Sequence, residues 1–197
     1  RVKILIIGPC QAGKTAIANF IAERSEVLNP NYHPTAACRI IEFEKQGPRN
    51  LKRPGQDQVL VELWDVSGDS KYERCWPAIQ KGTHGIILTY NADNPRQEEE
   101  MEAWVRNFPK KMQIPVNVCI GFAHHLNGKP IKNKSKPPKG MGSLQIYDTS
   151  IEEGTTTIHP AFDKFFANLM TMIYERQEKE EAKLMQGADQ FFLMNCD

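Results

Sequence analysis

The segment that most constrains this chain is residues 8–15, which read GPCQAGKT. It matches the phosphate-loop pattern of a glycine, four residues of any type, and then Gly-Lys followed by Ser or Thr. The apolar run at residues 2–7 predicts a buried strand, and residues 16–22 predict a helix. In this context the loop binds a polyphosphate through its backbone N–H groups and the positive end of the helix. A turn with two glycines and a lysine would not require these flanking elements.

Composition narrows the class of protein further. The 197 residues are 40% apolar and 25% charged, which is typical of one globular domain. A formal net charge of +1 argues against nucleic acid as a partner. The five scattered cysteines have no metal-ligand spacing and suit free thiols in a reducing cytosol. We expect no signal peptide, because the first apolar run is short and leads directly into the phosphate loop, and no membrane span, because no apolar run is long enough. We expect no lipid anchor, because residues 195–197 do not form a prenylation box.

Strand and helix patterns alternate along the chain. Strands are expected at residues 38–44, 59–64, 85–90, 116–120 and 144–147, and helices near 72–81, after Pro95 and from about 159. The strands at 38–44 and 59–64 are joined by a loop alone, so they form an antiparallel pair. This order predicts an α/β three-layer sandwich with a mostly parallel six-stranded sheet and one antiparallel strand. We expect one domain over residues 1–183 and a C-terminal tail over 184–197, which either folds back or marks a contact.

Several side chains are candidates for holding phosphates and a metal ion. Lys14 supplies a point charge, and Gly68 lets a backbone N–H approach the terminal phosphate. The predicted phosphate-binding residues are Pro9, Cys10, Gln11, Ala12, Gly13, Lys14, Thr15, Ala16 and Gly68. The predicted Mg²⁺ ligands are Thr15, Thr35 and, through water, Asp65. The alternatives are an ordinary turn at residues 65–68 and a threonine that merely flanks a strand.

These motifs resemble the Ras-like small GTPases, and more closely the Rab-like ones, over residues 2–174. Residues 8–15 are similar to the P-loop, 32–35 to switch I and 64–68 to the start of switch II. The resemblance implies GTP or GDP with Mg²⁺ as the ligand. It also marks Tyr32, Pro34 and Trp76 as candidate switch or partner contacts, with core packing the alternative for Trp76.

Other segments resemble the Rab-like GTPases of the intraflagellar transport B complex. These segments are residues 8–10, 62–65, 75–78, 84–85, 90–93 and 123–125. This resemblance implies coiled-coil subunits of that complex as partners, and a location in the cytoplasm, in the cilium or flagellum, and at its base.

The chain departs from the Ras-like pattern at two positions near the expected terminal phosphate. Asp69 stands where the family has the glutamine that orients the attacking water, and it would meet the phosphate with like charge. Cys10 stands where the Ras-type loop has a glycine, and its side chain crowds both the catalytic residue and an arginine finger. We expect no secure catalytic residue and at most a slow GTPase.

The guanine-reading Asn-Lys-x-Asp motif is also altered. His124 falls at its asparagine and Asn127 at its aspartate, so a neutral carbonyl replaces a carboxylate. His125 offers a ring face for stacking on the base, and Ser150 and Ile151 lie where a second base-contacting loop is expected. The alternative is that both histidines are ordinary loop residues with their hydrogen bonds made within the protein. The protein would then have no strict preference for guanine. Two functional hypotheses therefore remain: a weak nucleotide switch, or a structural subunit that uses the nucleotide as a folding cofactor.

Overall fold

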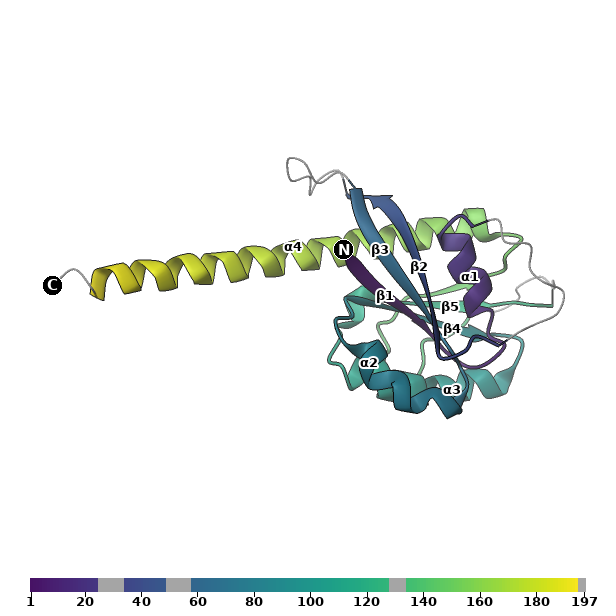
Figure 1. Cartoon of the computed structure of the whole chain (residues 1–197). Coiled ribbons are helices and arrows are strands. Elements are labelled where there is room, and N and C mark those ends of the chain that lie inside the picture. The colour runs from purple at the N-terminus through teal and green to yellow at the C-terminus, as the bar shows by residue number, and fades with distance from the viewer. Residues whose placement is uncertain (25–33, 49–57, 128–133, 195–197) are drawn as a thin grey trace.

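A six-stranded sheet with helices on both faces forms the body of the computed structural model (Figure 1). The structure describes residues 1–24, 34–48, 58–127 and 134–194. The strands are β1 (Val2–Ile7), β2 (Cys38–Gln46), β3 (Gln58–Val66), β4 (Gly85–Asn91), β5 (Cys119–His124) and β6 (Ile146–Thr149). They are ordered β2-β3-β1-β4-β5-β6, with β2 antiparallel to β3 and the other four pairs parallel. The predicted sandwich and its antiparallel strand are confirmed.

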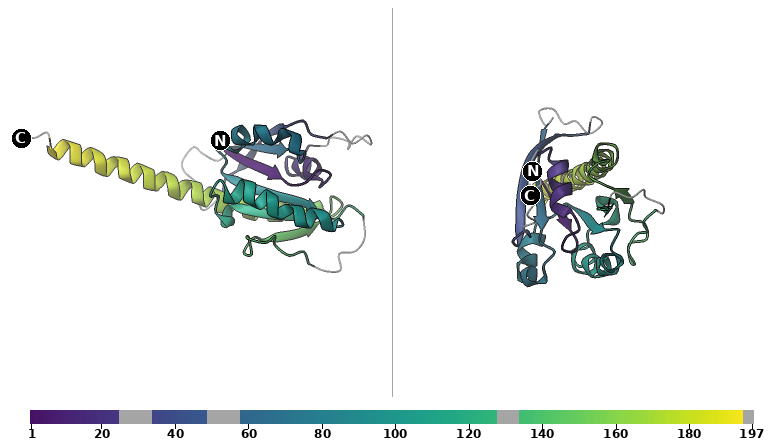
Figure 2. Two further views of the ribbon diagram at one scale, coloured as in Figure 1. Left: turned by 90° about the horizontal axis from the view of Figure 1, so that it is seen from below. Right: turned by 90° about the vertical axis from the view of Figure 1, so that its right-hand side faces the viewer.

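Helices cover the two faces in pairs (Figure 2). Helices α1 (Lys14–Ile21) and α4 (Gly154–Met194) pack on one face. Helices α2 (Trp76–Gln80) and α3 (Pro95–Val105) pack on the other. Shorter turns, η2 (Ser70–Cys75), η3 (Arg106–Lys110) and η4 (Val116–Val118), complete the connections. In the described part of the chain, no helix is both long and apolar enough to cross a membrane.

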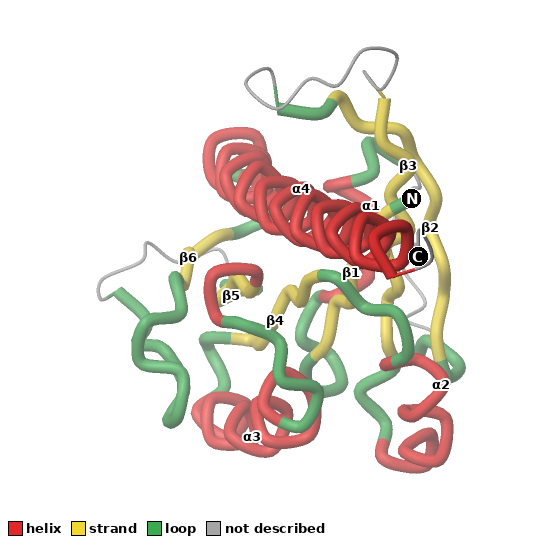
Figure 3. Tube along the Cα trace, turned by 90° about the vertical axis from the view of Figure 1, so that its left-hand side faces the viewer, coloured by secondary structure: helices red, strands yellow, loops and turns green. Residues whose placement is uncertain are grey.

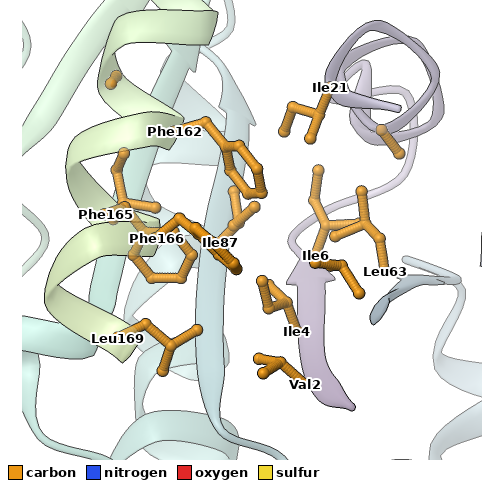
Figure 4. Packing of buried hydrophobic residues seen from close by; sticks show 14 of the residues in the cluster. Val2, Ile4, Ile6, Ile21, Leu63, Ile87, Phe162, Phe165, Phe166 and Leu169 are labelled. Atoms are coloured by element: carbon orange, nitrogen blue, oxygen red, sulfur yellow. The ribbon is translucent and has the colours of Figure 1, made fainter. Parts of the chain in front are cut away.

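Strand β1 lies between β3 and β4 and is buried on both faces, which explains why all of its residues except Lys3 are apolar. Ile4 and Ile6 point to the layer of α1 and α4, whereas Leu5 and Ile7 point to the layer of α2 and α3. Figure 4 shows the first pair opposite the aromatic rings of α4. Burial on both faces holds the end of β1 rigidly, and the phosphate loop begins there.

The long C-terminal helix buries apolar side chains where it contacts the sheet. Phe166, Leu169 and Met170 are buried, as their helical spacing predicts, and residues 175–185 are exposed. The 41-residue helix crosses the expected boundary at residue 183 without a break and projects away from the sheet (Figure 1). The backbone up to Met194 therefore does not fold back on the domain, while the division into domain and tail stays a prediction.

Two predicted strands lie further along the chain than expected. Residues 116–118 form η4 after Pro115, and β5 begins only at Cys119. β6 likewise begins at Ile146 rather than at residue 144. Gly121 lies within β5, and a Cβ there would lie 2.1 Å from Cδ1 of Ile146 in β6. A larger residue at this position would therefore require the Ile146 side chain to shift.

Candidate phosphate-binding site

The phosphate loop lies between β1 and α1, at the carboxyl edge of the parallel strands. Two of its glycines have positive φ angles, 144° at Gly8 and 83° at Gly13. A Cβ at Gly8 would lie 1.8 Å from the carbonyl oxygen of Thr89, and one at Gly13 would lie 2.0 Å from Nδ1 of His124. Backbone angle and close neighbours both demand glycine, so the loop adopts the path that its sequence pattern predicts.

Lys14 is buried at the start of α1, and its ammonium group is held by the loop itself. Nζ donates to the carbonyl oxygens of Gly8 at 2.9 Å and Pro9 at 2.6 Å. Burial lowers the pKa of Lys14 to about 8, although the Asp65 carboxylate opposes that shift. Because this pKa is close to neutral pH, an anionic ligand beside Lys14 would strongly stabilise its charged form. Binding of a phosphate is the role predicted for Lys14.

Thr15, Thr35 and Asp65 come from three separate elements and meet beside the loop. The Thr15 hydroxyl donates to Oδ2 of Asp65 at 2.6 Å and lies 3.2 Å from Oγ1 of Thr35, which is itself 3.4 Å from the same carboxylate oxygen. Burial raises the pKa of Asp65, and the Thr15 hydrogen bond and Lys14 counteract it. The structure thus brings together the three side chains predicted to surround Mg²⁺.

The donor set at this point suits a small hard cation. Oδ1 of Asp65 is buried and has no hydrogen-bond partner among the described residues, so it remains available as a ligand. Two hydroxyl oxygens and one carboxylate, completed by phosphate oxygens, are ligands that Mg²⁺ prefers. Within the described ranges no cluster of three or more His, Cys, Asp or Glu side chains offers a competing metal site.

The segment after β3 lies directly against the phosphate loop. A Cβ on Gly68 would be 2.3 Å from the backbone nitrogen of Cys10 and 2.4 Å from the carbonyl carbon of Pro9. Only glycine allows this approach, which agrees with the predicted position of Gly68 beside the phosphates. Cys10 itself is exposed at the loop surface.

Asp69 makes contacts within its own turn. Its Oδ1 accepts the backbone N–H of Lys71 at 3.0 Å, and its Oδ2 lies 2.9 Å from the Lys71 ammonium. These contacts lower the pKa of Asp69 and cap the first turn of η2. The residue at the position of the family's glutamine is therefore engaged as a cap.

His124 is the last residue of β5 and lies against the loop from the opposite side. It is buried, and its Nδ1 is 3.2 Å from the carbonyl oxygen of Ala12. Because a carbonyl only accepts, Nδ1 carries the proton. Burial lowers the pKa of His124. The ring thus contacts the phosphate-loop backbone, and its predicted contact with a base stays a prediction.

His125 is bracketed by two carboxylates. Its Nδ1 lies 3.2 Å from Oδ1 of Asp93, and its Nε2 lies 3.0 Å from Oδ1 of Asp148. The other oxygen of Asp93 accepts the backbone N–H groups of Leu126 and Asn127. These contacts fix the loop that replaces the guanine-reading motif, and neither aspartate could be linked to that loop from sequence spacing.

The second predicted base-contacting loop follows β6 at the same edge. The backbone N–H of His125 donates to the carbonyl of Thr149 at 2.8 Å, so the two loops are neighbours. The Ser150 hydroxyl accepts the backbone N–H of Glu153, and Ile151 packs against the core. The structure brings the predicted base-contacting residues to one edge, but their role in base recognition stays a prediction.

Gln97 in α3 was not predicted as a site residue. Its Nε2 donates to the carbonyl oxygen of Cys10 at 2.8 Å, and its Oε1 accepts the backbone N–H of Asn91 at 2.9 Å. The side chain is buried and connects α3, the end of β4 and the phosphate loop. A glutamine in a helix has no sequence signal for such a role.

The candidate partner contacts have different environments. Trp76 is half-buried, with ring centroids 5.4 Å from Trp104 and 5.0 Å from Phe108, which favours the packing alternative. Pro34 is exposed at the start of the segment leading to β2. Tyr32 lies outside the described residues.

Comparisons with known proteins agree with this geometry. Residues 3–127 match the Roc family, described as "Ras of Complex, Roc, domain of DAPkinase". The chain is 35% identical to human intraflagellar transport protein 22 homolog over 189 residues, covering 94% of this chain and 98% of the relative. It is 30% identical to Trypanosoma brucei intraflagellar transport protein 22 over 204 residues, covering 94% of this chain and 92% of the relative.

Solved structures of the trypanosome protein superpose on the chain. The GTP-bound crystal structure of T. brucei IFT22/74/81 has a TM-score of 0.71 at 26% identity, covering 89% of this chain and 98% of the matched chain. The GDP-bound crystal structure of T. brucei IFT22 has a TM-score of 0.65 at 29% identity, covering 86% of this chain and 96% of the matched chain. The mostly parallel sheet with one antiparallel pair is thus shared with proteins solved with both nucleotides.

Proposed function

This chain belongs to the intraflagellar transport protein 22 family of Ras-like GTPases, and from that premise we propose that it is an atypical Rab-like GTPase of the intraflagellar transport B complex. It binds GTP and GDP with Mg²⁺, hydrolyses GTP slowly, and serves in the assembly of a cilium or flagellum. Cytoplasm, cilium and ciliary base are its expected locations.

The observation that carries the nucleotide proposal is the convergence of Thr15, Thr35 and Asp65 beside Lys14. Lys14 and the backbone of the phosphate loop would hold the β- and γ-phosphates, while Thr15 and Thr35 would ligate Mg²⁺ directly and Asp65 through water. When bound, Mg²⁺ neutralises phosphate charge and orients the triphosphate. Thr35 and Gly68 would report the terminal phosphate to a partner surface.

Slow hydrolysis follows from the environment of Asp69. A carboxylate already paired with Lys71 supplies no amide to orient a water molecule, and its charge opposes approach to a phosphate. The Cys10 side chain narrows the space that an arginine finger would need. Both features favour a protein that retains its nucleotide over one that turns it over quickly.

The partners we propose are the coiled-coil subunits that correspond to IFT74 and IFT81. Support comes from the T. brucei relative, whose GTP-bound crystal structure is of IFT22/74/81. A second function, a nucleotide-loaded adaptor without switching, is favoured by the capped Asp69 and by the histidines in place of the guanine motif. In that case the nucleotide stabilises the fold, and partner affinity does not depend on the number of phosphates.

The experiment that tests the proposal starts from the nucleotide that the purified protein retains, identified by chromatography. Wild type should carry guanine nucleotide, and Lys14→Ala should lose it. Calorimetry with GDP and ADP then tests base preference, since equal affinities would remove the guanine assignment. A pull-down of the coiled-coil partners by wild type and Thr15→Asn separates the two functions: equal capture would favour the adaptor.

A further inference from the structure

A groove of about 950 Å³ lies at the end of the sheet opposite the phosphate loop. Its walls are residues 80–84 after α2, residues 111–118 before β5, and the part of α4 around Leu169–Glu180. The first two segments lead directly into the amino ends of β4 and β5, whereas the phosphate loop follows the carboxyl end of β1. Figure 3 views this end of the molecule along α4. The groove is therefore separate from the nucleotide site.

The floor of the groove is apolar. Met112 and Ile114 come from the segment before β5, and Met172 and Ile173 come from α4. All four are only partly buried and pack at the margin of the two core clusters. A concave surface that keeps several large apolar side chains partly exposed gains free energy when a partner covers it.

The rim of the groove is positively charged. Lys81 and Lys111 are exposed on two of its walls, and neither forms an ion pair with a described residue. On the third wall Arg176 is paired with Glu180 at 3.0 Å, so these two charges compensate. Burial lowers the pKa of His84, which keeps that ring neutral near pH 7. The rim thus presents two unpaired cations, which are complementary to an acidic segment.

The groove opens onto the free part of α4. Residues 175–185 of the helix, after the buried Tyr174, are exposed, and the wall of the groove continues for more than one turn beyond Tyr174, to Glu180. An α-helix about 10 Å wide fills roughly 400 Å³ per turn, so the groove accommodates on the order of two turns of helix.

We propose that this groove binds an α-helix of the coiled-coil partner, with an apolar stripe on the floor and acidic residues beside Lys81 and Lys111. The choice of partner rests on the proposed function, and the choice of a helix rests on the volume of the groove, its partly exposed apolar side chains and its charged rim. The contact does not involve the nucleotide site. It gives the chain a second contact with a long partner, at the end of the domain opposite the switch segments that are proposed to form the first.

The test measures binding of the GTP-loaded protein to the recombinant pair of IFT74 and IFT81 counterparts from the same organism. The variant Lys81→Glu/Lys111→Glu should raise Kd at least about tenfold, because two attractive contacts become repulsive. The variant Met172→Glu should also weaken binding, since it places a charge on the apolar floor. The control Lys134→Glu/Lys136→Glu makes the same change in net charge on exposed residues elsewhere and should bind like wild type.

Nucleotide affinity and melting temperature of each variant establish that it is folded. Unchanged Kd in both groove variants, with wild type binding well, would overturn the groove while leaving the proposed function intact. Failure of wild type to bind the pair at all would overturn both. If light scattering showed a dimer of wild type and a monomer of Lys81→Glu/Lys111→Glu, the occupant would be a second copy of this chain, which also contradicts the proposal.

Discussion

Nζ of Lys14 lies 2.6 Å from the carbonyl oxygen of Pro9, so the loop that precedes the lysine binds its ammonium group. A carbonyl dipole only partly replaces the lost hydration, and the pKa of Lys14 remains lowered to about 8. A phosphate adds full negative charges to this environment. Binding of an anion is therefore coupled to retention of the lysine proton.

We first predict that nucleotide affinity falls above about pH 8. A bound phosphate raises the pKa of Lys14 above its value of about 8 in the free protein, so the complex holds a proton that the free protein loses. Affinity for GDP should stay level below pH 8 and fall by up to about tenfold per pH unit above it. Calorimetry from pH 6.5 to about pH 9.5 measures this. Lys14→Met should bind weakly and lack the extra slope, and an identical slope in both proteins would contradict the coupling.

The second prediction concerns hydrolysis. Restoring the family residues in Asp69→Gln/Cys10→Gly should raise the single-turnover rate of GTP hydrolysis by about tenfold or more, because an amide can then orient the water molecule. Lys71→Ala is the matched control: it frees the Asp69 carboxylate from its partner without providing an amide, and it should give no gain. A wild-type rate already equal to that of the double variant would show that Asp69 and Cys10 do not limit the reaction.

The order of strands and helices was predictable because each has a local signal. β1 is apolar except at Lys3, β2 and β3 are joined by a loop alone, and Asn94 caps α3 as its sequence suggests. The phosphate loop was predictable because two of its positions require glycine, both for a positive φ angle and for the lack of space for a Cβ atom. The strand expected at residues 116–120 begins only at Cys119 and extends to His124, where it pairs with β6.

Contacts between distant side chains had no comparable signal. Asp93, Asp148 and His125 are brought together by the alignment of β4, β5 and β6, and nothing in their spacing indicates it. Gln97 reaches the phosphate loop only because α3 packs beside β4. Such residues depend on tertiary structure alone, whereas Thr15, Thr35 and Asp65 could be located through motifs attached to strand ends.

The third prediction is a loss of stability in mild acid. His124 is buried and His84 is more exposed but partly desolvated, and in both desolvation lowers the pKa below 6.5. The unfolded chain therefore binds more protons, so stability is full above pH 6.5 and falls as the pH drops through the lowered values. Melting temperatures between pH 7.5 and about pH 5 measure the loss.

Asparagine at either position can accept or donate a hydrogen bond without titrating. His124→Asn and His84→Asn should each flatten part of the pH dependence, and the double variant should flatten most of it. His159→Asn, at a half-buried ring beside Phe20, is the control and should leave the profile unchanged. A double variant as sensitive to acid as wild type would show that other groups are responsible.

The fourth prediction concerns thiol reactivity. Cys10 and Cys75 are exposed, whereas burial raises the pKa of Cys38 and of Cys119 to about 12 in each case. Iodoacetamide labelling with peptide mapping should modify the first two quickly and the last two slowly. GDP should protect Cys10, which lies in the phosphate loop, and leave Cys75 reactive as an internal control. Equal protection of both would point to a general change in structure.

The fifth prediction tests the contact between the segment after β3 and the phosphate loop. In Gly68→Ala the added methyl group would lie 2.3 Å from the nitrogen of Cys10, so the two backbones must separate. We expect unfolding to become easier by about 1–3 kcal/mol, with weaker binding of GTP than of GDP because Gly68 is predicted to lie beside the terminal phosphate. Urea denaturation and calorimetry measure the two effects.

Gly142→Ala is the matched control for that substitution. A Cβ at Gly142 meets no atom within 4 Å. The change should therefore be neutral or slightly stabilising, because alanine reduces the entropy of the unfolded chain. If Gly68→Ala were as stable as Gly142→Ala and kept the wild-type ratio of GTP to GDP affinity, the approach of Gly68 to the loop would have no part in sensing the nucleotide. A loss of stability with an unchanged ratio would assign Gly68 to packing alone. Only a shift in the ratio supports a switch whose moving part is the segment that begins at Gly68.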